Sequence, residues 1–238
     1  MCASASAYNP HSLRRVVKNS YTVLLVGNSR VGKSTLMHRF VGKYSDYVDH
    51  GSRGIEHKKI IIGNDNLVRI VVHDSDPNHR NMIESYYKFA VGIFFIYAID
   101  DRQSFESLVT WMEHNKIHGR KDCAEMIVGT KNDLEDVRKV TVTEAAKFAR
   151  SRGFSFMEVS AKEDAGVDAA FRIIACDIFS RVHEGLIDPE RVRADAGQVR
   201  VAPASIAEEK HRRGVHVVSN LRFHGPSQTE RKPQSRWQ

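Results

Sequence analysis

Short apolar runs alternate with amphipathic stretches through the middle of the 238-residue chain. The runs have the length of β-strands, and the stretches between them repeat their apolar positions every three to four residues, as helices do. This alternation is typical of strands joined by crossover helices in a parallel sheet. The predicted strands are residues 21–26, 57–63, 67–73, 91–99, 125–129 and 155–160, and the predicted helices are residues 33–42, 82–90, 104–116, 142–153 and 167–182.

One connection departs from this alternation. Only residues 64–66, with the sequence NDN, separate the second and third strands, which is too short for a crossover. That pair is therefore predicted to be an antiparallel hairpin. In the fourth helix, Thr143 with Glu144 is taken as the start signal and Gly153 as the stop. The expected fold is α/β, with a six-stranded, mostly parallel sheet and helices on both faces.

Composition changes toward both ends of the chain. The apolar rhythm begins at residue 21 and fades after residue 183, so we expect one domain over 21–183. Residues 1–20 form a basic extension expected to be flexible, and residues 184–238 a basic tail expected to be mostly disordered. The net charge of +7 lies largely in these ends and is not interleaved with aromatic residues, which argues against nucleic-acid binding.

Other sequence features bear on the compartment. No apolar run approaches the roughly 18 residues of a membrane span, and the N-terminus lacks the apolar block of a secretory signal. The three cysteines show neither a disulfide pattern nor the spacing of a metal site. We expect a cytoplasmic monomer.

The first motif that carries chemistry is a glycine-rich loop. Residues 27–34 read GNSRVGKS, with the spacing G-x-x-x-x-G-K-S, between a predicted strand and a predicted helix. In this context backbone N–H groups surround an anion at the positive end of the helix. Lys33 would reach the outer phosphates and the Ser34 hydroxyl would bind magnesium. The loop therefore predicts binding of nucleotide phosphates.

Two further motifs close later strands: GTKND at residues 129–133 and SAK at residues 160–162. With the phosphate loop before them, they make the chain resemble the Ras superfamily of small GTPases, whose guanine-binding motifs read [N/T]-K-x-D and S-A-K. The resemblance implies that Asp133 accepts two hydrogen bonds from guanine, which adenine cannot offer. It also implies that the stem of Lys131 lies along the base and that the backbone N–H of Ala161 binds the guanine oxygen.

Further segments are similar to the Rab branch, namely RGIEH at 53–57, SYYKFA at 85–90 and SFESLVTW at 104–111. The resemblance covers residues 21–183 and implies a small GTPase G domain of the P-loop NTPase class that binds GTP or GDP with Mg²⁺. The implied nucleotide-binding residues are Gly27, Asn28, Ser29, Arg30, Val31, Gly32, Lys33, Ser34, Thr35, Thr130, Lys131, Asp133, Ser160, Ala161 and Lys162. The implied magnesium residues are Ser34, Ser52, which stands where the family has threonine, and Asp74.

The segment after the third strand departs from the family. Rab proteins read DTAGQE there, and this chain keeps Asp74 but continues SDPN. Pro77 replaces the glycine whose N–H contacts the terminal phosphate, and proline has no N–H to donate. Asn78 replaces the glutamine that orients the attacking water and is one methylene shorter, with His79 as the alternative if the gap in the alignment is moved. GTP hydrolysis is therefore predicted to be slow or lost.

Two other departures concern affinity and anchoring. Arg30 stands where Ras and Rab proteins usually have glycine, which predicts strain if the backbone there needs a positive φ. The tail has no cysteine for prenylation, so at most weak, reversible membrane contact through basic residues is expected. The resulting interpretation is a Rab-like molecular switch, in trafficking or signalling, that binds effectors and regulators through its switch region. The alternative is a non-hydrolysing or nucleotide-free scaffold that binds a protein partner.

Overall fold

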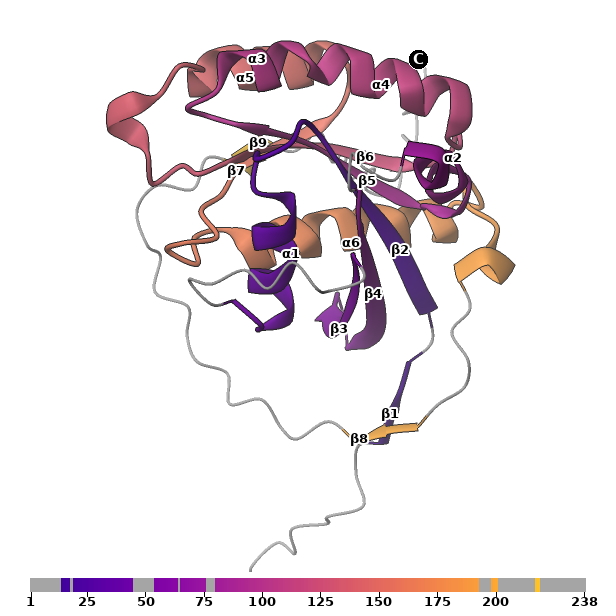
Figure 1. The fold of residues 1–238 in the computed structure, drawn as a ribbon. Coiled ribbons are helices and arrows are strands. Elements are labelled where there is room, and N and C mark those ends of the chain that lie inside the picture. Colours follow the sequence, from indigo (N-terminus) through magenta and orange to yellow (C-terminus); the bar gives the residue numbers. More distant parts are fainter. Residues whose placement is uncertain are drawn as a thin grey trace, which may run out of the picture.

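The structure is a computed structural model that describes residues 14–17, 19–44, 54–63, 65–75, 80–192, 198–200 and 217–218. Its centre is a seven-stranded sheet in the order β3-β4-β2-β5-β6-β7-β9 (Figure 1). Strands β2, β4, β5, β6 and β7 run parallel, and β3 and β9 are antiparallel to their neighbours. The bounds are β2 Asn19–Val26, β3 Ile55–Ile62, β4 Asn66–Asp74, β5 Gly92–Ala98, β6 Ala124–Thr130, β7 Ser155–Glu158 and β9 Val217–Val218.

The six strands predicted from the sequence are all present, and the predicted α/β fold is confirmed. The second and third form the expected antiparallel hairpin, in which Ile62 pairs with Asn66. Gly63 and Asp65 make its turn with φ values of 50° and 65°, a left-handed conformation that glycine and aspartate adopt more readily than other residues.

Three short strands lie in the segments predicted to flank the domain. β1, Arg14–Val16, pairs antiparallel with β8, Gln198–Arg200. β9 adds a seventh strand to the sheet beside β7, with Met157 opposite Val217 (Figure 1). Apolar side chains also continue past residue 183, because Ile187 is fully buried against the core.

Helices cover both faces of the sheet (Figure 1). On one face lie α1, Lys33–Val41, and α6, Val167–His183. On the other lie α2 to α5, with bounds α2 Arg80–Phe89, α3 Arg102–Glu106, α4 Leu108–His118 and α5 Val142–Ser151. Two short 3₁₀ helices, η2 Glu135–Val137 and η3 Pro189–Val192, complete the described elements.

Two helix predictions need correction. The single helix expected over 104–116 is divided at Ser107 into α3 and α4. The Ser107 hydroxyl donates to the carbonyl of Gln103 and accepts from the side chain of Asn28, a contact from a distant loop that the local pattern could not reveal. Helix α5 starts at Val142 as predicted, but its cap is Thr141 and not Thr143, because the Thr141 hydroxyl accepts the N–H of Glu144.

The core consists of two apolar layers, one on each face of the sheet. In the first, the ring of Phe171 on α6 stacks on Phe40 of α1 at 3.8 Å between centroids. In the second, Phe105 of α3 packs edge-on against Tyr97 of β5 at 5.0 Å. Each fully buried large apolar side chain contributes roughly 1.5–3 kcal/mol. The layers make the sheet a rigid support for the loops at its carboxyl edge.

Candidate nucleotide-binding site

The loop after β2 lies where the strand order reverses, because β2 has β4 on one side and β5 on the other. In open parallel sheets, ligands bind outside the carboxyl ends of the strands at such a reversal. The two other predicted motifs end β6 and β7, at the same edge. The register pairs Tyr97 with Gly129 and Gly129 with Glu158, so the ends of β5, β6 and β7 are adjacent.

The backbone of the phosphate loop depends on its glycines. Gly27 has a φ of 154°, and a Cβ there would lie 2.2 Å from the carbonyl oxygen of Ile96. Gly32, immediately before α1, has a φ of 89°. Arg30 between them has a φ of 65°, so the conformation predicted to strain this residue is present. Val31 is fully buried and holds the loop to the core.

Lys33 is the first residue of α1, and its side chain turns back into the phosphate loop. Its side chain is only 6% exposed, and its Nζ donates to the carbonyls of Gly27 at 3.0 Å and Asn28 at 2.8 Å. These bonds curve the loop around the ammonium group. The ammonium and the N–H groups at the start of α1 together form a positive site for an anion.

Two oxygen donors lie next to the loop. The Ser34 hydroxyl donates a hydrogen bond to Oδ2 of Asp74, which joins the start of α1 to the end of β4. A hydroxyl and a carboxylate are the hard oxygen ligands that Mg²⁺ prefers, so these residues fit the implied ion. Within the described ranges, no group of three or more His, Cys, Asp or Glu side chains forms a further metal site.

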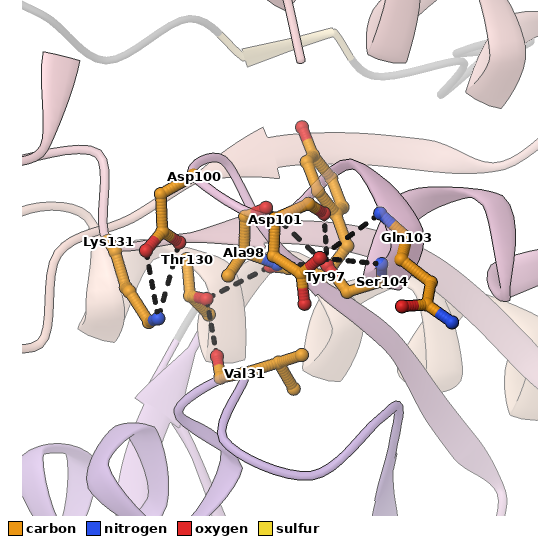
Figure 2. Close-up of polar contacts among 9 residues, drawn as sticks. All are labelled: Val31, Tyr97, Ala98, Asp100, Asp101, Gln103, Ser104, Thr130 and Lys131. Carbon is orange, nitrogen blue, oxygen red and sulfur yellow. Dashed lines mark hydrogen bonds and ion pairs between the residues drawn. The ribbon is translucent and has the colours of Figure 1, made fainter. Parts of the chain in front are cut away.

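Thr130 connects the base motif to the phosphate loop. Its hydroxyl lies 2.5 Å from the carbonyl oxygen of Val31 and 2.9 Å from that of Tyr97 (Figure 2). It is 4% exposed, so both contacts are shielded from water. The Thr130 hydroxyl therefore links the loop after β6 to the phosphate loop.

Lys131 and its neighbours lie where the resemblance places the guanine base. Lys131 has a left-handed φ of 60°, and its Nζ forms an ion pair with Asp100, at 3.2 and 3.3 Å from the two carboxylate oxygens (Figure 2). The neighbouring Asp101 caps α3 by accepting the N–H groups of Gln103 and Ser104. The cap fixes the loop that carries Asp100, and the ion pair directs the lysine stem.

Asp133, the expected guanine acceptor, is oriented by the SAK motif. The hydroxyl of the fully buried Ser160 donates to Asp133 Oδ1 at 2.6 Å. The same hydroxyl accepts the N–H of Glu163 at 3.1 Å. A carboxylate has about four acceptor positions, so Asp133 keeps capacity for two donors from a base.

A buried ion pair joins the segment after the GTKND motif to the end of β7, which precedes the SAK motif. Arg138 donates two hydrogen bonds to Glu158, both at 2.8 Å, and Glu158 is 4% exposed. Tyr97 also donates to Glu158, at 3.2 Å. Burial, and secondarily the Glu158 carboxylate, raise the pKa of the Tyr97 hydroxyl, which stays protonated. Removing either charge of such a pair costs about 3–5 kcal/mol, so the loops are firmly connected.

Sequence reasoning assigned no supporting role to the side chain of Asn28. Its amide nitrogen donates to Ser107 at 3.0 Å, and its amide oxygen accepts from the indole N–H of Trp111 at 3.0 Å. Both partners lie in the SFESLVTW segment, whose similarity to the Rab branch does not imply this contact. No local signal in the sequence identifies Asn28 as the shared partner of Ser107 and Trp111.

The structure brings the predicted phosphate-loop residues, Asp74 and the two base loops to one edge of the sheet. The predicted Ser52, Asn78 and His79 lie outside the described residues, and so does Pro77. Ser29 and Arg30 are exposed at the tip of the loop.

Comparison with known proteins agrees with this arrangement. The family model described as Ras family matches residues 22–180. The Ras-related protein RABA5b of Arabidopsis thaliana is 32% identical over 185 residues, which cover 76% of this chain and 85% of that protein. The Ras-related proteins Rab11D and Rab11C of Nicotiana tabacum are each 29% identical over 209 residues, covering 87% of this chain and 91% of each relative. The chain therefore belongs to the Ras family, as a Rab-like small GTPase.

Proposed function

We propose that this protein binds GDP and GTP with Mg²⁺ and that it retains guanine recognition while hydrolysing GTP slowly. One observation carries the binding half of the proposal. The Lys33 loop and the Asp133–Ser160 pair lie at one edge of the sheet and are joined through Thr130. This supports a ligand with a guanine at one end and phosphates at the other.

The proposed roles follow the chemistry of the residues. Lys33 and the loop N–H groups bind the phosphates, and Ser34 with Asp74 holds the ion. Bound Mg²⁺ would neutralise charge on the phosphate oxygens. Asp133 accepts the two guanine donors, Lys131 covers one face of the base, and the N–H of Ala161 meets the guanine oxygen. Ser52 is proposed as an additional magnesium ligand.

The slow-hydrolysis half rests on sequence. Pro77 cannot supply the N–H that senses the terminal phosphate, and Asn78 is too short to hold water where glutamine would. A displacement near 1 Å costs on the order of a hundredfold in rate. His79 remains a second candidate for orienting the water.

Titration tests the binding half. With magnesium present, GDP should bind at least about 1,000-fold more tightly than ADP, because adenine leaves Asp133 without its donors. Asp133→Asn should weaken GDP binding by roughly a hundredfold or more, because the amide N–H of asparagine would face the hydrogen-bond donors of guanine. The exposed Asp136→Asn, on the same loop, is the matched control and should have no effect. Equal affinity for GDP and ADP would refute guanine recognition.

The nucleotide content of the purified protein and its rate of single-turnover GTP cleavage test the proposed slow hydrolysis. Freshly purified protein that carries GTP, with cleavage far slower than that of an ordinary Rab protein, would support the proposal. Cleavage at an ordinary Rab rate would contradict it. An empty pocket would instead favour a nucleotide-free scaffold, the second candidate function, which the strained Arg30 conformation also favours.

We further propose that effectors and regulators bind at the switch region and that the protein acts in vesicle trafficking or signalling as a cytoplasmic monomer. Ras-family membership supports the first part of this proposal. Among the described residues, no helix has both the length and the apolar character needed to cross a membrane.

A further inference from the structure

An arginine in α1 reaches the loop that is expected to bind guanine. Arg39 lies in the last turn of α1, the helix that begins with Lys33 at the phosphate loop. Its Nε donates to the carbonyl of Ala161 at 2.5 Å, and its Nη2 donates to the carbonyl of Lys162 at 3.0 Å. One guanidinium therefore holds two successive carbonyls of the SAK loop, 122 and 123 residues further along the chain.

These bonds determine where the N–H groups of the loop point. In a planar trans peptide the C=O and the following N–H point in opposite directions. When Arg39 holds the Ala161 carbonyl, the N–H of Lys162 must face away from α1. When it holds the Lys162 carbonyl, the N–H of Glu163 must do the same, and that N–H donates to the Ser160 hydroxyl at 3.1 Å.

The contacts continue as a chain to the guanine acceptor. The Ser160 hydroxyl, which accepts from Glu163, donates in turn to Asp133 Oδ1 at 2.6 Å. The order is thus the Arg39 guanidinium, the peptide between Lys162 and Glu163, the Ser160 hydroxyl and the Asp133 carboxylate. Bonds in such a chain polarise and strengthen one another, and the first is charge-assisted.

An aromatic ring restrains the guanidinium from its other side. The centroid of the Tyr44 ring lies 3.4 Å from the Arg39 Cζ, in stacking contact. Planar stacking suits arginine but not lysine, and lysine cannot present two donors in a fixed fork. The contact between Arg39 and Tyr44 therefore requires an arginine. Displacement of the Tyr44 ring would release the Arg39 side chain.

We propose that Arg39 is a positioning residue for guanine specificity, which acts through the SAK loop and Ser160 on Asp133, and that Tyr44 holds it in place. The inference rests on the proposed guanine binding. It further predicts that a partner which displaces Tyr44 loosens the base before the phosphates. Purely structural support of α1 would instead affect all ligands alike.

Two ligands separate these possibilities. GDP carries the groups that Asp133 and the SAK loop recognise. Purine riboside 5′-diphosphate keeps the purine ring, the ribose and the phosphates but lacks the guanine oxygen, the N1–H and the amine. In the full-length protein with magnesium, Arg39→Lys should weaken GDP about tenfold, a factor that corresponds to about 1.4 kcal/mol. It should change the affinity for purine riboside diphosphate less than twofold.

Matched variants complete the test. Arg172 on α6 also donates to a carbonyl, that of Ile61 at 2.6 Å, far along the sheet from the SAK loop, and Arg172→Lys should leave both affinities unchanged. Tyr44→Phe, which keeps the ring, should be neutral, whereas Tyr44→Leu should weaken GDP severalfold even if the Arg39 variant fails to fold.

The outcomes are distinct. A fall in selectivity for GDP over purine riboside diphosphate in the Arg39 and Tyr44→Leu variants supports the role. An equal loss for both ligands, or no loss for either, overturns it. If the wild-type protein itself does not prefer GDP, the proposed function fails instead, before any variant is compared.

Discussion

Arg30 offers a direct test of how strain in the phosphate loop affects stability. Its φ of 65° is left-handed, a conformation that costs an L-residue with a Cβ about 1–2 kcal/mol. The side chain is exposed and makes no hydrogen bond or ion pair to any residue in the described ranges. Replacing Arg30 by glycine therefore removes strain without removing a hydrogen bond or ion pair within the described ranges.

The expected magnitude is a difference between two terms. Glycine relieves about 1–2 kcal/mol of strain but loses about 0.5–1 kcal/mol more conformational entropy on folding. Arg30→Gly should thus stabilise the domain by about 0–1.5 kcal/mol, with a central value of about 0.75 kcal/mol. For a domain of about 150–250 residues, each kcal/mol raises Tm by about 2–4 °C, so the central value corresponds to a rise of about 1.5–3 °C.

A substitution series makes the test independent of that small value. Asparagine tolerates left-handed φ better than arginine, and β-branched valine tolerates it less. Tm measured by calorimetry at saturating GDP should rank glycine above asparagine, asparagine above arginine and arginine above valine. GDP release should be slowest from the glycine variant, because a relaxed loop leaves its binding conformation less often. A valine variant as stable as the wild type, or a glycine variant less stable, would refute strain at this residue.

Three further predictions concern other parts of the molecule. The indole N–H of Trp111 donates a hydrogen bond to Asn28 in the phosphate loop, so GDP binding should change the fluorescence of Trp111 in a Trp237→Phe variant. Loss of this hydrogen bond in Trp111→Phe should speed GDP release about two- to tenfold. Burial raises the pKa of the Glu125 carboxyl in the folded protein. Ionisation of this carboxyl therefore destabilises the fold at a pH above the raised pKa. It has no effect on stability at a pH below the ordinary glutamate pKa, where the carboxyl is protonated in both the folded and the unfolded chain. Glu125→Gln should therefore raise Tm at pH 7, and the gain should vanish on acidification below pH about 4. Restoring glycine and glutamine through Pro77→Gly and Asn78→Gln should raise single-turnover GTP cleavage on the order of a hundredfold, and an unchanged rate would mean that the defect lies elsewhere.

The sheet and the phosphate-loop motif were predictable because their signals are local. A buried strand such as β5 is a continuous apolar run, and the phosphate-loop spacing is read within eight residues. The start of α5 was predicted correctly, but its cap was assigned to Thr143, although Thr141 and Glu144 have the spacing of a capping box.

The remaining features depend on contacts between distant segments. Nothing near Ser107 indicates that Asn28, 79 residues earlier, bonds its hydroxyl where the helix divides. The partners of Arg39 lie more than 120 residues away, and the surrounding helix pattern gives it the appearance of an ordinary surface residue. The pairing of β9 with β7 likewise joins a polar tail to the sheet edge. Such contacts follow from the fold and cannot be read from periodicity.

The arrangement of the site explains why binding and hydrolysis can be lost separately. The contacts proposed to hold the nucleotide come from the loops after β2, β6 and β7, and each loop has its own support: Trp111 for the phosphate loop, Arg138 for the Asp133 loop and Arg39 for the SAK loop. The departures that predict slow hydrolysis fall after β4, beyond Asp74, and none of these supports includes a residue from that segment. Changes at Pro77 and Asn78 would therefore alter groups proposed to meet the terminal phosphate and leave the supports of the proposed base site intact. Such a chain can lose GTP hydrolysis and still prefer guanine. If Pro77→Gly with Asn78→Gln speeds cleavage and leaves the affinity for GDP unchanged, hydrolysis and guanine binding are independent.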